Sequence, residues 1–178
     1  SGHLNTVGFD LYMKLLGEAV SEEKGVQTHE SECTVDLRIN AYIPDSYIAD
    51  ATARVEAYKA ISTISDDADM YDVTDELIDR FGTPPQEVQA LINTARLRAM
   101  ASSLGICKIS ASDTGILFYF KDMPDWDTIS EITAKYPRRL FFSPGAQPYF
   151  TLNDSGELAQ IKRFLENLSK CMDKKTQN

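Results

Sequence analysis

The chain has 178 residues, of which 43% are hydrophobic, and its 18 basic and 27 acidic residues give a net charge of −9. This hydrophobic content is enough for a sizeable core, so the length accommodates one domain or one domain with a helical extension. The negative charge argues against direct binding of nucleic acid and favours a basic protein surface as the partner.

The first residues predict a helix that precedes the main domain. Residues 7–20 repeat apolar side chains at helical spacing, and the polar residues 21–31 then interrupt the pattern. Because the chain begins almost inside this helix, we expect it to be a fragment of a larger protein, with residues 1–32 as a leading helix and linker. Residues 33–178 are then expected to form the main domain.

The next segments predict one strand and one helix. Residues 34–43 alternate apolar and polar side chains, which is typical of a strand with one buried face. Residues 51–64 carry apolar side chains at helical spacing. Asp66, Asp67 and Asp69 follow, and their short side chains compete for backbone hydrogen bonds, so we expect a solvated acidic turn there.

An amphipathic helix with an acidic face follows this turn. Its apolar stripe recurs every four residues, while three acids fall together on another side. Gly82 and the two prolines after it favour a helix end at this point. The stripe consists of Val73, Leu77 and Phe81, and the acids are Asp72, Glu76 and Asp79.

The remainder predicts one more helix and then a β-rich half. The helix should begin within residues 83–86 and continue to Leu104. A helix over 125–136, with Trp126, Ile129 and Ile132 facing inward, and a second over 156–172 should accompany the strands. The strands are expected at 106–110, 116–120, 139–142 and 149–152.

These elements together predict an α+β fold. The N-terminal helical half contains the leading helix, one strand and three helices, and a small, mostly antiparallel sheet with two helices follows.

No enzymatic or metal site is predicted. The phosphate-binding pattern G-x-x-x-x-G-K-[ST] is absent. A catalytic triad needs a histidine, and His3 and His29 lie in segments without a predicted core. His29 and Cys33 make only two potential metal ligands, and a calcium loop beginning at Asp67 would place Ile78 where a glutamate belongs. We therefore assign no metal and no cofactor.

The compartment is predicted from what the chain contains. Cys33, Cys107 and Cys171 are far apart and have no metal-ligand spacing, so reduced thiols are the simplest interpretation. No stretch has the pattern of a signal peptide, and none approaches the roughly 20 apolar residues of a membrane-spanning helix. A cytoplasmic protein without a membrane contact is expected.

The acidic helix face has two interpretations. It is either a solvated face, in which Glu76 pairs with Arg80 one turn later, or a docking face for a basic partner. Seven acids against one base between Asp66 and Arg80 cannot be neutralised by pairing within the helix. Both interpretations stay open on the residues alone.

Several short motifs, in their order and spacing, resemble the C-terminal domain of the bacterial transcription-repair coupling factor family, known as Mfd. The resemblance is specific from Ser1 to about Lys108 and mainly one of pattern beyond it. The motifs are Val7-Gly8-Phe9-Asp10-Leu11-Tyr12, Val35-Asp36-Leu37-Arg38, Ile43-Pro44-Asp45, Arg54 with Tyr58-Lys59, Glu76-Leu77-Ile78-Asp79-Arg80-Phe81-Gly82, and Ala95-Arg96-Leu97-Arg98 with Leu104-Gly105-Ile106.

The resemblance implies that residues 1–32 come from the end of a motor region and that residues 33–178 are a C-terminal regulatory domain. The parent protein would be a superfamily 2 double-stranded DNA translocase that removes stalled RNA polymerase and recruits UvrA. Its C-terminal domain would pack on the UvrB-like N-terminal module and mask the UvrA-binding surface. The contact would use the acids Glu76 and Asp79 against arginines, and we add Asp72 because it lies on the same side. An interaction module with another partner, bound through the β-rich half, is the alternative.

Overall fold

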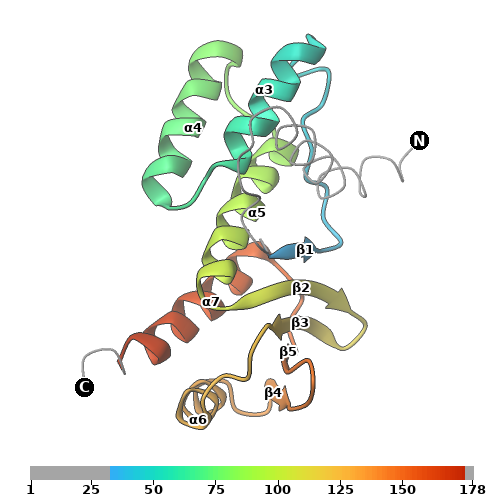
Figure 1. The fold of residues 1–178 in the computed structure, drawn as a ribbon. Helices are drawn as coiled ribbons and strands as arrows, with labels where there is room; N and C mark the ends of the chain where they lie inside the picture. Colours follow the sequence, from blue (N-terminus) through green and yellow to red (C-terminus); the bar gives the residue numbers. More distant parts are fainter. Residues whose placement is uncertain (1–32, 175–178) are drawn as a thin grey trace. The chain divides into compact units, whose positions relative to one another are not determined.

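The computed structural model describes residues 33–174, which divide into two compact units (Figure 1). The described part of the helical unit comprises residues 38–99, and that of the sheet unit comprises residues 33–37 and 100–174. The helix predicted at 7–20 and the loop predicted at 21–31 lie outside the described residues.

The helical unit is built from three helices, α3 (Ala51–Ser62), α4 (Asp67–Phe81) and most of α5 (Gln86–Ser103). Asp50 caps α3 by accepting a hydrogen bond from the Ala53 N–H at 2.8 Å. Apolar side chains from the three helices and from the segment before α3 form one core. Its buried members are Ile43, Ile48, Ala57, Ile61, Ile64, Leu77, Val88, Leu91, Ile92 and Ala95.

The sheet unit contains five strands in the order β1-β2-β3-β5-β4. Only the β1 and β2 pair is parallel, and the other three neighbouring pairs are antiparallel. The predicted α+β class with a mostly antiparallel sheet is therefore confirmed. The strands are β1 (Thr34–Asp36), β2 (Ile106–Ser112), β3 (Gly115–Phe120), β4 (Leu140–Ser143) and β5 (Tyr149–Leu152).

One face of this sheet packs against helices. Phe118 and Phe150 are cross-strand partners on β3 and β5, and both are fully buried. Their rings contact Phe164 of α7 (Leu158–Asp173), with centroid separations of 4.5 and 6.1 Å. The other helix, α6 (Trp126–Lys135), packs on α7 and on β4. This aromatic layer is the core of the sheet unit.

Three predictions about local structure are wrong. The strand predicted at 34–43 ends at Asp36, because the chain leaves β2 there and Ile43 packs in the helical core instead. Asp66 caps α4, so this helix starts at Asp67, inside the segment that was predicted to be an acidic turn. Trp126 is 64% exposed rather than buried, since it is the first residue of α6.

Candidate functional site

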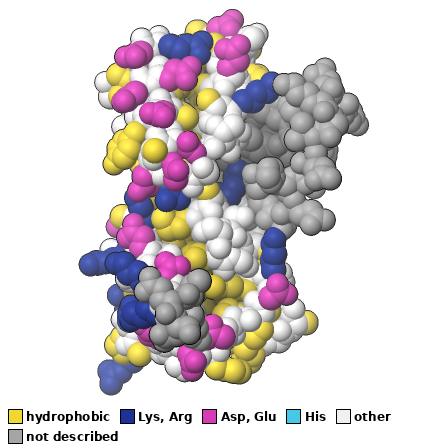
Figure 2. All heavy atoms as spheres, turned by 60° about the vertical axis from the view of Figure 1, so that its left-hand side comes forward, with side chains coloured by type: hydrophobic (Ala, Val, Ile, Leu, Met, Phe, Trp, Pro, Cys, Tyr) yellow, Lys and Arg dark blue, Asp and Glu magenta, His cyan; other side chains and the backbone are white. Residues whose placement is uncertain are grey.

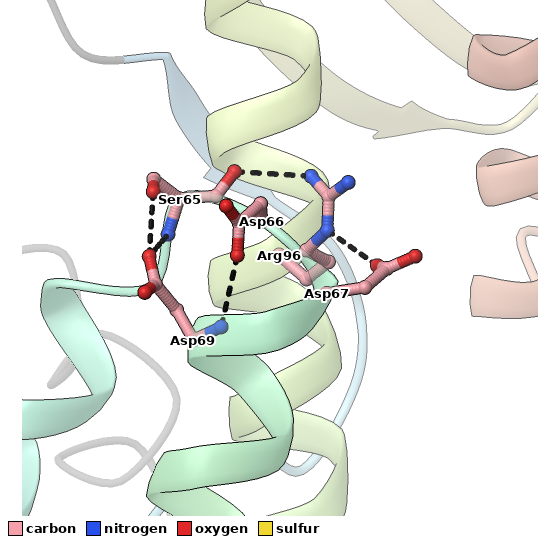
Figure 3. Close-up of polar contacts among 5 residues, drawn as sticks. All are labelled: Ser65, Asp66, Asp67, Asp69 and Arg96. Atoms are coloured by element: carbon pink, nitrogen blue, oxygen red, sulfur yellow. Dashed lines mark hydrogen bonds and ion pairs between the residues drawn. The ribbon is translucent and has the colours of Figure 1, made fainter.

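The acids at the start of α4 hold the helix in place (Figure 3). The Asp66 carboxylate accepts a hydrogen bond from the Asp69 N–H at 2.9 Å. Asp69 in turn accepts from the Ser65 N–H at 2.9 Å and from the Ser65 hydroxyl at 2.5 Å. These bonds lower the pKa of Asp69, the hydroxyl contributing most. The Asp66 side chain therefore caps the Asp69 N–H, and the Asp69 side chain caps the Ser65 N–H one turn earlier.

A cation from α5 joins this cap. The Arg96 Nε donates to Asp67 at 2.8 Å, and its Nη1 donates to the Ser65 carbonyl at 3.3 Å (Figure 3). The Arg96 side chain is only 15% exposed, so solvent screens this contact less than an ordinary surface pair. The segment predicted as a solvated acidic turn is thus the anchored N-terminus of α4.

The acids further along α4 face outward. Asp72, Asp75, Glu76 and Asp79 are all exposed, and at 100° per residue they fall within an arc of about 100° on the helix. We call these four residues the acidic face. Asp72, Glu76 and Asp79 were predicted site residues, and the structure brings them together. Asp75 was not predicted as one, although its spacing of three from Asp72 and four from Asp79 would have revealed it.

The four carboxylates differ in their local pairing. Glu76 accepts from Arg80 one turn later at 3.4 Å, and Arg80 also lies 3.7 Å from Glu56 of α3. The Arg80 and Glu76 side chains are 45% and 61% exposed, so this pair contributes only a few tenths of a kcal/mol. No ion-pair partner within residues 33–174 compensates Asp72, Asp75 or Asp79. Glu76 is therefore partly neutralised by its own helix, whereas Asp79 is not.

A shallow groove lies beside the acidic face, between α3 and α4. Its volume is about 160 Å³, its floor is apolar, and its rim carries the two glutamates and Arg80. The Arg80 guanidinium also stands 4.9 Å from the centroid of the Phe81 ring. The lining residues are Glu56, Ala57, Ala60, Val73, Glu76, Leu77 and Arg80.

A tyrosine holds the C-terminal end of α4. The Tyr47 hydroxyl donates to the Gly82 carbonyl at 2.8 Å and lies 3.3 Å from the Leu77 carbonyl. Gly82 ends the helix with a φ of 85°, a conformation that glycine adopts without strain, as the sequence predicted. Burial also raises the pKa of the Tyr47 hydroxyl.

Negative charge is concentrated on the helical unit. Residues 38–99 contain 6 basic and 11 acidic residues, while residues 33–37 and 100–174 contain 9 and 10. Figure 2 shows acidic side chains gathered over the surface of the helical unit. Among the described residues, no three His, Cys, Asp or Glu side chains form a cluster that could hold a metal ion. The candidate site is therefore a charged surface beside a shallow groove.

Comparison with known protein families identifies the family of this chain. The model of the TRCF domain family matches residues 37–130, which include all of α4. The chain belongs to the TRCF domain family. The family predicted from the motifs is therefore confirmed, and the acidic face lies on a helix within the matched part of the TRCF domain.

Curated relatives of this TRCF domain are transcription-repair-coupling factors. The protein from Staphylococcus aureus strain USA300 is 41% identical over 111 residues, which are 61% of this chain and 10% of that protein. The protein from Staphylococcus haemolyticus strain JCSC1435 is 36% identical over 111 residues, with the same shares of both chains. The chain thus spans about a tenth of the length of the curated relatives it matches.

A solved structure has the same fold. The crystal structure of a C-terminal domain of transcription-repair coupling factor matches with a TM-score of 0.72 at 21% sequence identity. The match covers 82% of this chain and 96% of that domain. The TRCF domain described here therefore corresponds in fold to the C-terminal domain of such a factor. No helix within residues 33–174 is both long and apolar enough to cross a membrane.

Proposed function

We propose that this TRCF domain is a non-catalytic, autoinhibitory domain that docks through its acidic face. Its parent protein is an ATP-dependent double-stranded DNA translocase that removes stalled RNA polymerase and recruits nucleotide excision repair. The domain binds the UvrB-like N-terminal module of the same protein and masks the surface that UvrA recognises. We call this autoinhibitory contact the latch. Engagement of RNA polymerase then releases it, so UvrA and polymerase are partners of the parent rather than of this domain.

The observation that carries the proposal is the set of outward carboxylates on α4 without local compensation. Asp72, Asp75 and Asp79 are exposed and have no ion-pair partner among the residues described. Each exposed carboxylate can accept two parallel hydrogen bonds from one guanidinium group. The remaining negative charge of the helical unit adds long-range attraction to a basic module and speeds its docking.

The energies of docking and release are comparable. Removal of one partner from a charge pair desolvated in an interface costs about 2 kcal/mol or more. A closed form that opens on a signal is separated from its open form by a few kcal/mol. Loss of one acid from the acidic face therefore shifts the parent protein measurably toward the open form.

The decisive experiment uses the full-length parent protein. We expect increased binding of UvrA in two variants, Asp79→Asn and the double variant Glu76→Gln with Asp79→Asn. Surface plasmon resonance or calorimetry measures the affinity. The matched control is Asp122→Asn, which removes an exposed carboxylate from the sheet unit. The control should bind UvrA at the wild-type level. Wild-type binding by both acidic-face variants as well would contradict the latch.

A second experiment tests the nature of the contact. The isolated N-terminal module is titrated with this domain at low and at high salt, because screening weakens a contact between charged surfaces. We expect binding that falls with salt and with substitution of Asp79. Affinity will be lower than within one chain, since tethering supplies a high effective concentration.

A second candidate function is an interaction domain with a different partner. The exposed apolar side chains of the sheet unit favour it, since Trp126 is 64% and Phe141 is 51% exposed. A partner that binds this domain equally well before and after substitution of Asp79 would support this function over the latch.

A further inference from the structure

Two of the five exposed large apolar side chains in the described part of the chain belong to α6 and β4, at one margin of the sheet unit. Trp126 is the first residue of α6 and Phe141 is on β4, with exposed fractions of 64% and 51%. Figure 1 shows β4 beside α6 at this margin. This apolar margin is separate from the acidic face of α4, so the proposed latch does not account for it.

The strand at this margin has an open hydrogen-bonding edge. β4 is the last strand in the sheet order and pairs only with β5 among the described strands. The Asn153 N–H donates to the Arg139 carbonyl at 2.8 Å, which sets the phase of the ladder. Residues 139, 141 and 143 therefore bond to β5, whereas Phe142 directs its N–H and C=O away from the sheet.

Aromatic side chains flank this edge on both faces. The Phe142 ring packs against Phe150 at 5.0 Å and against Trp126 at 6.2 Å, so Trp126 lies on the helix-covered face of the sheet. Phe141 points to the opposite face, because successive side chains of a strand alternate. A strand added to this edge would contact Trp126 and Phe141 with alternate side chains.

A cation marks one end of the edge. Arg138 is exposed, and apart from glycines it is the one described residue with a positive φ, at 63°. The Arg139 and Leu140 N–H groups both donate to the Tyr136 carbonyl at 3.1 Å, which fixes this turn directly before β4. No ion-pair partner within residues 33–174 compensates Arg138, so the end of the edge attracts a carboxylate.

We propose that β4 is a strand-addition site for an extended segment of another protein, with alternating apolar residues and an acidic end. The segment runs antiparallel to β4, so that its C-terminal end meets Arg138. Its backbone bonds to Phe142, its apolar side chains contact Phe141 and Trp126, and its carboxylates pair with Arg138. Main-chain bonds supply affinity in this binding mode, and the side-chain contacts supply selectivity.

The test uses the complete 178-residue chain and a labelled synthetic peptide. The peptide alternates valine with threonine and ends in two aspartates, and a second peptide ends in two lysines. Fluorescence anisotropy should detect the acidic peptide, and hydrogen exchange should slow at the Phe142 amide when it binds. Binding without protection of that amide would overturn the assignment to the strand edge, as would failure of the acidic peptide to bind.

Matched variants separate the apolar contribution of Phe141 from the charge contribution of Arg138. Phe141→Lys should weaken the acidic peptide about tenfold or more, while Thr34→Lys on the opposite edge strand should not. Arg138→Glu should reverse the preference between the two peptides, while Lys170→Glu on α7 should preserve it. Equal losses in a variant and its control, or a dimer formed through β4 in the unliganded chain, would overturn the proposal. None of these outcomes depends on the acidic face.

Discussion

The N-terminal cap with the first turn of α4 and the remainder of the helix are both acidic, yet they have different roles. We call residues 65–69 the first half and residues 70–81 the second half. The first half places Asp66, Asp67 and Asp69 within hydrogen-bonding distance of Ser65, Arg96 and the helix backbone. The second half places its acids on the exposed side of the helix, where only Glu76 has a charged partner among the described residues. Acidic residues therefore stabilise the helix at its N-terminus and remain available for a partner beyond it.

This difference teaches that the position of a carboxylate on the helix decides its role. Within the first turn, unsatisfied N–H groups and the positive end of the helix dipole compete for a carboxylate. From Asp72 onward all backbone N–H groups are satisfied inside the helix, so a carboxylate there bonds to a side chain, to solvent or to another protein rather than to the helix backbone. Substitutions in the first half should therefore lower the stability of the domain, whereas substitutions in the second half should weaken its docking.

The largest effect is expected from charge reversal on the acidic face. Asp79→Lys should weaken docking of the domain on the N-terminal module by about 2 kcal/mol or more, which is about 30-fold in affinity. Glu76→Gln should weaken it less, because Arg80 already compensates Glu76 in the free domain. Titration of the isolated module measures both values, and an equal loss for both variants would contradict the difference in pairing.

Removal of the Arg96 guanidinium should affect the first half. Arg96→Met is expected to lower the free energy of unfolding by about 1 to 2 kcal/mol, because it breaks the hydrogen bonds to the Asp67 carboxylate and to the Ser65 carbonyl. Chemical denaturation measures the change. Lys59→Met, on an exposed position of α3, serves as the control and should remain within about 0.5 kcal/mol of wild type.

A pair of alanine substitutions compares the halves directly. Asp66→Ala should lower the free energy of unfolding by about 1 kcal/mol through loss of the N-cap. Asp75→Ala, on the same helix and of the same charge, should change it by less than about 0.5 kcal/mol. Comparable destabilisation by both variants, measured by urea unfolding, would mean that the halves do not differ in the way described.

Acid should destabilise the first half selectively. The hydrogen bonds from Ser65 lower the pKa of Asp69 below its value in the unfolded chain. The stability that they supply is therefore complete above the unfolded pKa and is lost as pH falls through the folded pKa. Unfolding measured from about pH 5 downward should show a smaller acid-induced loss in Asp69→Asn than in wild type. An identical loss in both proteins would contradict the cap.

The smallest effect is expected from the exposed ion pair. Arg80→Met should change the free energy of unfolding by only a few tenths of a kcal/mol, since the contacts with Glu76 and Glu56 are long and solvated. Thermal unfolding at low and high salt measures it. A large, salt-sensitive loss would show that Arg80 is a structural part of the groove.

Much of the fold was predictable because the apolar periods are strong. Helices α3 to α7 and the last four strands lie within a few residues of their predicted positions, since the apolar spacing sets which side chains reach a core. The sequence did not predict the shortness of β1, because its register depends on β2, about 70 residues away. The extent of a strand pairing follows from tertiary contacts that a local pattern does not contain.

The candidate site was predictable in part. Helical spacing placed Asp72, Glu76 and Asp79 together, and the structure agrees. The same spacing did not distinguish these acids from Asp67, whose partner Arg96 lies 29 residues further along the chain. Separating structural from available carboxylates requires the position of every cation, and that information exists only after the helices have packed.

Arg96 and Tyr47 fasten α4 at its two ends. These contacts hold both ends of the helix, and the interval between its outward carboxylates is near one turn, about 5.4 Å. In the docking that we propose, a basic partner with guanidinium groups at a similar spacing pairs with two of these carboxylates at once.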